Sequence, residues 1–270
     1  MKNFIWTTDI HLDRLDENDR KEFTEWLREQ SADAVVISGD IGEGDCVTSY
    51  LRGLHDSVGK PIYFVLGNHD FYQRTFTEVR ASIRELINEC KNLQWLSESG
   101  VIQLSETCAM IGHECWGDGR NGDYENASSL LMDFRLIKDY AGLSKEERLS
   151  LLNSIGDKAA ACIKKNLVEA FNSYTHVYLI THVPPFREAC LDRSLRICDD
   201  KKLPFYTCKA VGDILLEIMN NHPTHKLTVL SGHTHEGCDV RILDNLRVVV
   251  KDAGYGSWYD PSIIKVEDNH

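Results

Sequence analysis

Residues 62–70 read Ile-Tyr-Phe-Val-Leu-Gly-Asn-His-Asp, an unbroken apolar run that stops at a glycine and three polar residues. β-Branched and aromatic residues in a run of this length predict a strand that is buried on both faces. Four other apolar runs are likewise followed, within three residues, by Asp or His. These runs cover residues 4–6, 35–37, 177–180 and 227–230, and they precede Asp9, Asp40, His182 and His233 in that order. The sequence therefore predicts five buried strands with polar residues at their carboxyl ends.

Between these runs, apolar residues recur at the three- and four-residue spacing of an amphipathic helix. This spacing occurs in residues 23–27, 79–90 and 211–219. Because strands alternate with helices, the pattern predicts an α/β layered fold. Extended runs around residues 101–111 and 240–251 predict two hairpins, which would add antiparallel strands to the sheet.

The chain has no internal repeat and no low-complexity linker, so we expect a single domain over residues 1–270. The least regular part of the sequence predicts a cap or loop insertion at about residues 113–147. Such an insertion would lie over one side of the functional site.

Composition narrows the functional classes. The 270 residues are 42% hydrophobic and 27% charged, which is typical of a soluble globular protein. The formal net charge of −12 opposes an extended nucleic-acid surface or an anionic membrane surface, since both require clustered basic residues. The apolar runs are much shorter than the roughly 20 residues of a membrane-spanning helix. Asp9 stands where a signal peptide would still be apolar, so we expect a cytoplasmic protein.

The nine cysteines include no C-x-x-C pair, and their odd number predicts free thiols in a reducing compartment. A zinc knuckle formed by Cys190, Cys198 and Cys208 is the less favoured alternative, because the spacing of these residues is irregular.

The polar residues after the strands are candidate metal ligands. Ligands of α/β folds bind beyond the carboxyl ends of the strands, where the loops converge. A single histidine after a strand is more often structural, but five segments place Asp, Asn or His at the same position. Carboxylate and imidazole ligands without thiolates suit Mn, Fe, Zn or Ni. The seven candidates can hold two divalent ions if one ligand is shared; they are Asp9, His11, Asp40, Asn68, His182, His233 and His235.

The motifs D-x-H, G-D, G-N-H-D, a lone His and G-H-x-H, in this order, resemble the calcineurin-like metallophosphoesterase family. The resemblance implies a four-layer sandwich of two mixed β-sheets flanked by helices, with two metal ions at one end. It implies a metal-bridging hydroxide as the attacking group, His69 as the general acid and Asp70 as the residue that orients the ring of His69. The implied ligands are Asp9, His11, Asp40 and His235 for one ion, and Asp40, Asn68, His182 and His233 for the other.

The substrate implied by the resemblance is a small phosphate ester. The third motif ends in Asp70, as in phosphodiesterases, and no Asp-Arg-Gly block follows Asp40, so a phosphodiester is favoured. A phosphomonoesterase or a phosphoprotein phosphatase is the alternative, and a non-catalytic scaffold of the same fold is less favoured because every motif position is filled. The oligomeric state stays open. Four side chains near the motifs are candidates for contact with the substrate: Arg74, His113, Arg120 and Arg187.

Overall fold

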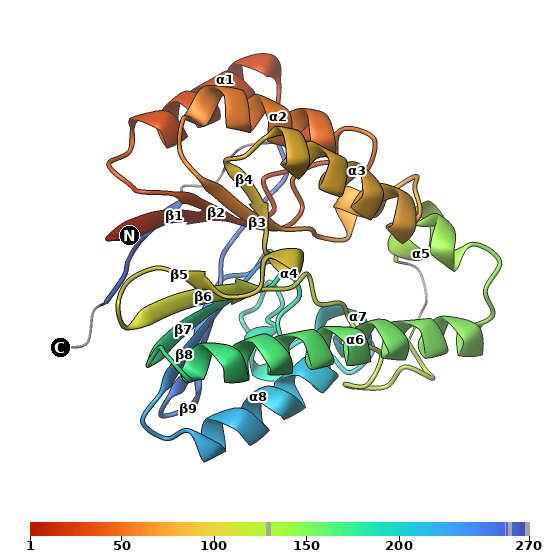
Figure 1. The fold of residues 1–270 in the computed structure, drawn as a ribbon. Helices are drawn as coiled ribbons and strands as arrows, with labels where there is room; N and C mark the ends of the chain where they lie inside the picture. Colours follow the sequence, from red (N-terminus) through yellow and green to blue (C-terminus); the bar gives the residue numbers. More distant parts are fainter. Residues whose placement is uncertain (128–130, 257, 259–260, 268–270) are drawn as a thin grey trace.

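The computed structural model describes residues 1–127, 131–256, 258 and 261–267, and two mixed β-sheets face each other at its centre (Figure 1). In the first sheet β1 to β4 are parallel, and β11 pairs with β1 in the antiparallel sense. The strand order is β11 (Ser262–Lys265), β1 (Asn3–Thr7), β2 (Val35–Ser38), β3 (Ile62–Val65) and β4 (Leu93–Trp95).

The second sheet has six strands and contains both predicted hairpins. Strands β6, β7, β8 and β10 are parallel, while β5 and β9 pair with β6 and β10 in the antiparallel sense. The strand order is β5 (Ile102–Gln103), β6 (Cys108–Gly112), β7 (His176–Ile180), β8 (Lys226–Ser231), β10 (Leu246–Val250) and β9 (Cys238–Leu243). The prediction of two mixed sheets flanked by helices is confirmed.

Helices cover the outer face of each sheet (Figure 1). α1 (Glu17–Glu29), α2 (Val47–Val58) and α3 (Phe76–Glu89) lie on the first sheet. α6 (Lys145–Phe171) and α8 (Lys209–Asn221) lie on the second sheet. The short segments are η1 (Leu12–Arg14), η2 (His69–Phe71), α4 (Leu96–Ser99), α5 (Asp133–Leu136), η3 (Lys138–Tyr140), η4 (Arg187–Ala189) and α7 (Leu203–Tyr206).

The apolar residues of strand β1 do not alternate with polar ones, because both faces of the strand are covered. Ile5 belongs to the core between the first sheet and its helices, whereas Phe4 and Trp6 belong to the core between the two sheets. Since successive side chains of a strand point to opposite faces, a strand covered on both faces needs apolar residues at every position. The polar residues begin at the carboxyl end of the strand.

The segment predicted as a cap, residues 113–147, contains α5 and η3, and its residues 128–130 lie outside the described residues. Its last residues belong to α6, which begins at Lys145 behind a capping box formed by Ser144 and Glu147. The last three residues of the segment are therefore helical.

All nine cysteines are free thiols. Cys190 lies beside Cys198, whereas Cys208 lies beside Cys115, so the three residues of the alternative zinc knuckle do not gather in the structure. Within the described residues, no helix is both long enough and apolar enough to span a bilayer.

Candidate metal centre

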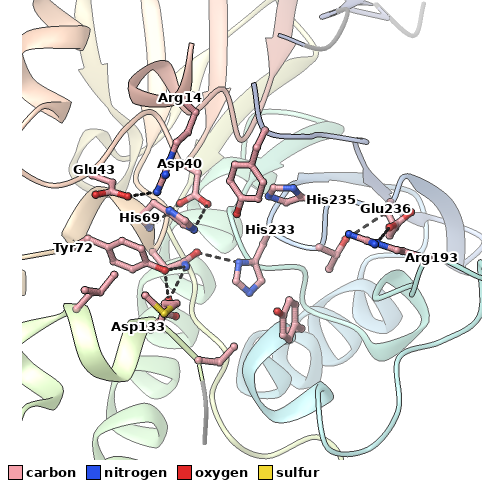
Figure 2. Close-up of a pocket in the computed structure, with 17 residues that line it drawn as sticks. Arg14, Asp40, Glu43, His69, Tyr72, Asp133, Arg193, His233, His235 and Glu236 are labelled. Atoms are coloured by element: carbon pink, nitrogen blue, oxygen red, sulfur yellow. Dashed lines mark hydrogen bonds and ion pairs between the residues drawn. The ribbon is translucent and has the colours of Figure 1, made fainter. Parts of the chain in front are cut away.

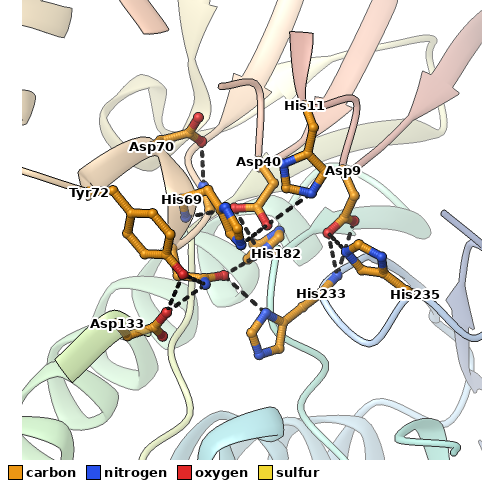
Figure 3. Close-up of polar contacts among 12 residues, drawn as sticks. Asp9, His11, Asp40, His69, Asp70, Tyr72, Asp133, His182, His233 and His235 are labelled. Carbon is orange, nitrogen blue, oxygen red and sulfur yellow. Dashed lines mark hydrogen bonds and ion pairs between the residues drawn. The ribbon is translucent and has the colours of Figure 1, made fainter. Parts of the chain in front are cut away.

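Five loops meet where the parallel strands of both sheets end (Figure 3). Backbone hydrogen bonds connect neighbouring loops: the Asp9 N–H donates to Gly39 O at 3.0 Å, and the His11 N–H donates to Asp40 O at 3.0 Å. The Gly232 N–H donates to His182 O at 3.0 Å in the second sheet. These bonds hold the loops after β1 and β2 together, and likewise the loops after β7 and β8.

The first ligand group consists of Asp9, His11, Asp40 and His235, whose ligand atoms all lie within 4.8 Å of one another. His235 Nε2 lies 3.2 Å from Asp9 Oδ1, and His11 Nε2 lies 3.7 Å from Asp40 Oδ2. Both ring nitrogens of His11 are buried without a hydrogen-bond partner. Because an unpaired buried polar atom costs free energy, this arrangement fits a bound cation that would accept the lone pair of His11.

The second ligand group is arranged around Asn68. Asn68 Oδ1 lies 3.0 Å from His182 Nε2 and 3.1 Å from His233 Nδ1, while His182 Nε2 lies 3.4 Å from Asp40 Oδ1. Asp40 therefore belongs to both groups. The ring nitrogen of each histidine that does not face Asn68 lies near a backbone carbonyl. His182 Nδ1 is 2.9 Å from Ser38 O, and His233 Nε2 is 3.2 Å from Phe205 O. Such outer contacts fix the ring orientation of metal-binding histidines.

The charges of the site depend on one another. Although burial opposes charge on Asp40, the neighbouring His182 and His69 hold the pKa of this carboxyl well below its usual range. Burial also opposes charge on His182, but Asp40 outweighs it and raises the pKa of His182 to about 10. Burial and the proximity of His182 lower the pKa of His233 to about 3. A divalent cation bound here would supply positive charge that stabilises the Asp40 carboxylate.

Backbone strain is concentrated in the same residues. Five of the seven candidate ligands have a positive φ: Asp9 (48°), His11 (38°), Asp40 (52°), His233 (71°) and His235 (62°). Left-handed conformations are unfavourable for residues with a side chain, and they persist where the surroundings hold them for a functional reason. The strain supports a role for these residues in a binding site.

The family follows from a match that covers most of the sequence. The model of the family described as calcineurin-like phosphoesterase matches residues 2–237. The chain belongs to the calcineurin-like phosphoesterase family. The candidate metal-binding cluster of Asp9, His11, Asp40 and His235 is consistent with the metal dependence of this family.

Known proteins resemble this chain over part of its sequence or in fold. The UDP-2,3-diacylglucosamine hydrolase of Stenotrophomonas maltophilia strain K279a is 35% identical over 99 residues, which are 32% of this chain and 40% of that enzyme. The chain therefore matches less than half the length of that relative. The phosphopantetheinyl hydrolase of Mycobacterium tuberculosis shares the fold, with a TM-score of 0.65, 17% identity and coverage of 94% of this chain and 89% of that one. A dimetal phosphatase from Danio rerio has a TM-score of 0.54 at 11% identity, over 93% and 87% of the two chains.

A cavity of about 540 Å³ opens over the ligand groups of the phosphoesterase (Figure 2). The His69 side chain lines it, and His69 Nε2 lies 3.9 Å from Asp40 Oδ2. The His69 backbone N–H donates to Asp40 Oδ1 at 2.9 Å, which ties the position of this residue to the shared carboxylate.

The Asp70 carboxyl makes contacts other than the predicted one with the ring of His69. Asp70 Oδ1 accepts hydrogen bonds from the N–H groups of Ile41 (2.9 Å) and Gly42 (3.0 Å), and Asp70 Oδ2 accepts one from Gly67 (2.7 Å). Burial and the nearby Asp40 raise the pKa of Asp70 to about 8, although these N–H donors oppose the shift. In these contacts the carboxyl joins the loops after β2 and β3 instead of orienting the ring of His69.

The four side chains expected to contact the substrate do not line this cavity. Arg120 pairs with Asp118 at 3.0 Å and with Asp157 at 2.8 Å. Each of the others lies near a carboxylate: Arg187 is 3.4 Å from Asp200, Arg74 is 3.9 Å from Asp45, and His113 is 3.5 Å from Glu114.

Two other arginines, Arg14 and Arg193, line the cavity on opposite sides (Figure 2). Arg14 lies three residues after His11, so its proximity to the D-x-H motif is a sequence signal for its position. Arg193 lies in a hairpin closed by the bridge between Leu191 and Ile197, and no motif marks it.

Gly67 tests how closely the loop after β3 must approach Asp40. A Cβ atom on Gly67 would lie 2.2 Å from Asp40 Oδ1, closer than any real contact. We expect Gly67→Ala to displace Asp40 and to weaken Mn²⁺ binding by about 10- to 100-fold, the usual effect of disturbing residues that support a metal ligand. Isothermal titration calorimetry on the metal-stripped protein measures this. Gly53→Ala is the matched control, since a Cβ there meets no described atom within 4 Å, and equal Mn²⁺ affinity in both variants would contradict the prediction.

Proposed function

We propose that this phosphoesterase hydrolyses a phosphodiester, with two divalent cations bound by the two ligand groups and His69 as the general acid. Asp9, His11, Asp40 and His235 would hold one cation, and Asp40, Asn68, His182 and His233 the other. Donors limited to carboxylate, amide and imidazole groups favour Mn, Fe, Zn or Ni. When bound, the two cations would polarise the phosphate ester and lower the pKa of water, as in other two-metal hydrolases.

The observation that carries the proposal is the position of His69. Its ring lines the cavity next to the shared carboxylate but belongs to neither ligand group. The ring stands edge-on to His11, with centroids 4.6 Å apart, and lies against Tyr72 at 4.4 Å. An imidazole that two neighbouring rings hold beside the proposed cation site is placed to act as the proton donor to the departing ester oxygen.

Charge in the cavity favours a diester over a monoester. The described lining residues include two arginines and no lysine. Arg14 Nη2 lies 2.5 Å from Glu43, and Arg193 Nε lies 4.0 Å from Glu236, so each arginine faces a carboxylate (Figure 2). A phosphomonoester carries up to two negative charges at pH 7, whereas a diester carries one. Because both arginines already face carboxylates, they compensate the second negative charge of a monoester poorly.

The alternative of a phosphomonoesterase or phosphoprotein phosphatase makes a different kinetic prediction. We expect the protein, stripped of metal and reloaded with Mn²⁺, to hydrolyse bis-p-nitrophenyl phosphate with a kcat/KM at least about tenfold above that for p-nitrophenyl phosphate, equivalent to about 1.4 kcal/mol. The stripped protein without Mn²⁺ is the control for contaminating activity. A preference for the monoester would overturn the diester proposal, and turnover of neither ester with bound Mn²⁺ would favour the scaffold alternative.

A further inference from the structure

Asp133, in α5, lies beside a candidate metal ligand that is 65 residues away in sequence (Figure 3). Asn68 Nδ2 donates a hydrogen bond to Asp133 Oδ1 at 2.9 Å. The Tyr72 hydroxyl donates to the same oxygen at 2.8 Å. Asp133 is 7% exposed, so these contacts are largely shielded from water. Neither the D-x-H nor the G-N-H-D motif indicates this partner.

The contact determines which way the Asn68 amide faces. With Nδ2 directed at Asp133, the other end of the amide, Oδ1, faces His182 Nε2 and His233 Nδ1. Rotating the amide by half a turn would place its oxygen against the Asp133 carboxyl oxygen, where two acceptors face each other without a proton. It would also present an NH₂ group, which cannot bind a cation, to the second ligand group.

We propose that Asp133 is a positioning residue that holds the Asn68 amide with its oxygen toward the second metal ion. The inference rests on the proposed function, because it requires a second cation in that group. It assigns a role to the segment around α5, which brings a carboxylate to the centre from outside the family motifs.

Other contacts hold α5 in place, so the effect of Asp133 can be separated from docking of the segment. The Gln73 N–H donates to Leu136 O at 2.8 Å, and the Lys138 N–H donates to Arg74 O at 3.0 Å. Asp139 Oδ2 accepts a hydrogen bond from the Phe76 N–H at 2.7 Å. Asp139 thus joins the same segment to the body of the protein without touching Asn68, and it provides the matched control.

The test is a titration of metal-stripped protein with Mn²⁺, followed by electron paramagnetic resonance and equilibrium dialysis. We expect Asp133→Leu to bind one Mn²⁺ with wild-type affinity and the second about 10- to 100-fold more weakly, with loss of the spin-coupled pair signal. Asp133→Asn retains an amide oxygen that can accept from Asn68, so it should give a smaller loss. Asp139→Leu should bind both ions as the wild type does.

Wild-type affinity for both ions in Asp133→Leu would overturn the inference. Equal weakening in Asp133→Leu and Asp139→Leu would also overturn it, because the role would then be docking of the segment. If Asp133→Leu fails to fold by circular dichroism, Asp133→Ala, which also lacks an acceptor for Asn68, carries the test, and unchanged binding of both ions in that variant overturns the inference. A wild-type protein that binds fewer than two Mn²⁺ ions would instead refute the proposed function.

Discussion

Replacing Asp40 by asparagine should lower kcat/KM for bis-p-nitrophenyl phosphate by about 10³-fold or more, since Lewis-acid stabilisation by metal ions amounts to several kcal/mol. Asp40 is the one carboxylate that both ligand groups share, with Oδ2 at 3.7 Å from His11 Nε2 and Oδ1 at 3.4 Å from His182 Nε2. An amide of the same size removes the negative charge on which both cations depend. We therefore expect the variant to lose at least one equivalent of Mn²⁺ by elemental analysis.

Asp213→Asn is the control for this variant, because Asp213 is an exposed residue of α8 that pairs with Lys209. Its metal content and turnover should equal those of the wild type. Two equivalents of tightly bound Mn²⁺ in Asp40→Asn, together with more than a tenth of the wild-type activity, would contradict the bridging role.

The second large effect is expected for His69→Gln, which should keep both Mn²⁺ ions and lose about 10²- to 10⁴-fold in kcat. The loss should depend on the leaving group. Diphenyl phosphate releases a phenolate that needs a proton, whereas p-nitrophenolate is a stable anion and leaves without one. A general acid therefore matters more for the first substrate than for the second.

Comparison of the two substrates separates proton donation from other roles of His69. Equal losses for diphenyl phosphate and bis-p-nitrophenyl phosphate would indicate that His69 only shapes the cavity. Reduced Mn²⁺ content would assign it to the metal ligands. Either result would remove His69 as the general acid.

The layered fold could be predicted because its signals are local. Strands covered on both faces require continuous apolar runs, and the runs at residues 4–6, 35–37 and 62–66 coincide with β1, β2 and β3. Two long helices, α2 and α6, were not predicted although local signals exist. In α2 the buried residues Val47, Leu51, Leu54 and Val58 follow helical spacing, and α6 begins with a capping box.

The gathering of the seven candidate ligands could be predicted because parallel strands bring their carboxyl ends together at one edge. The left-handed backbone at Asp9 and Asp40 could not be predicted, since Asp has only a modest preference for this conformation and tertiary contacts decide where it occurs. The same holds for Arg193 and Asp133, which reach the site through a hairpin and a short helix. The substrate arginines were predicted from sequence proximity alone, and salt bridges direct Arg120 elsewhere.

The central claim is that catalysis requires two cations around Asp40. Stepwise addition of Mn²⁺ to metal-stripped protein, with bound metal and hydrolysis of bis-p-nitrophenyl phosphate measured at each step, tests it most directly. We predict two bound equivalents, with little turnover at the first and full turnover at the second. Full turnover with a single equivalent, or no turnover with two, would contradict the claim.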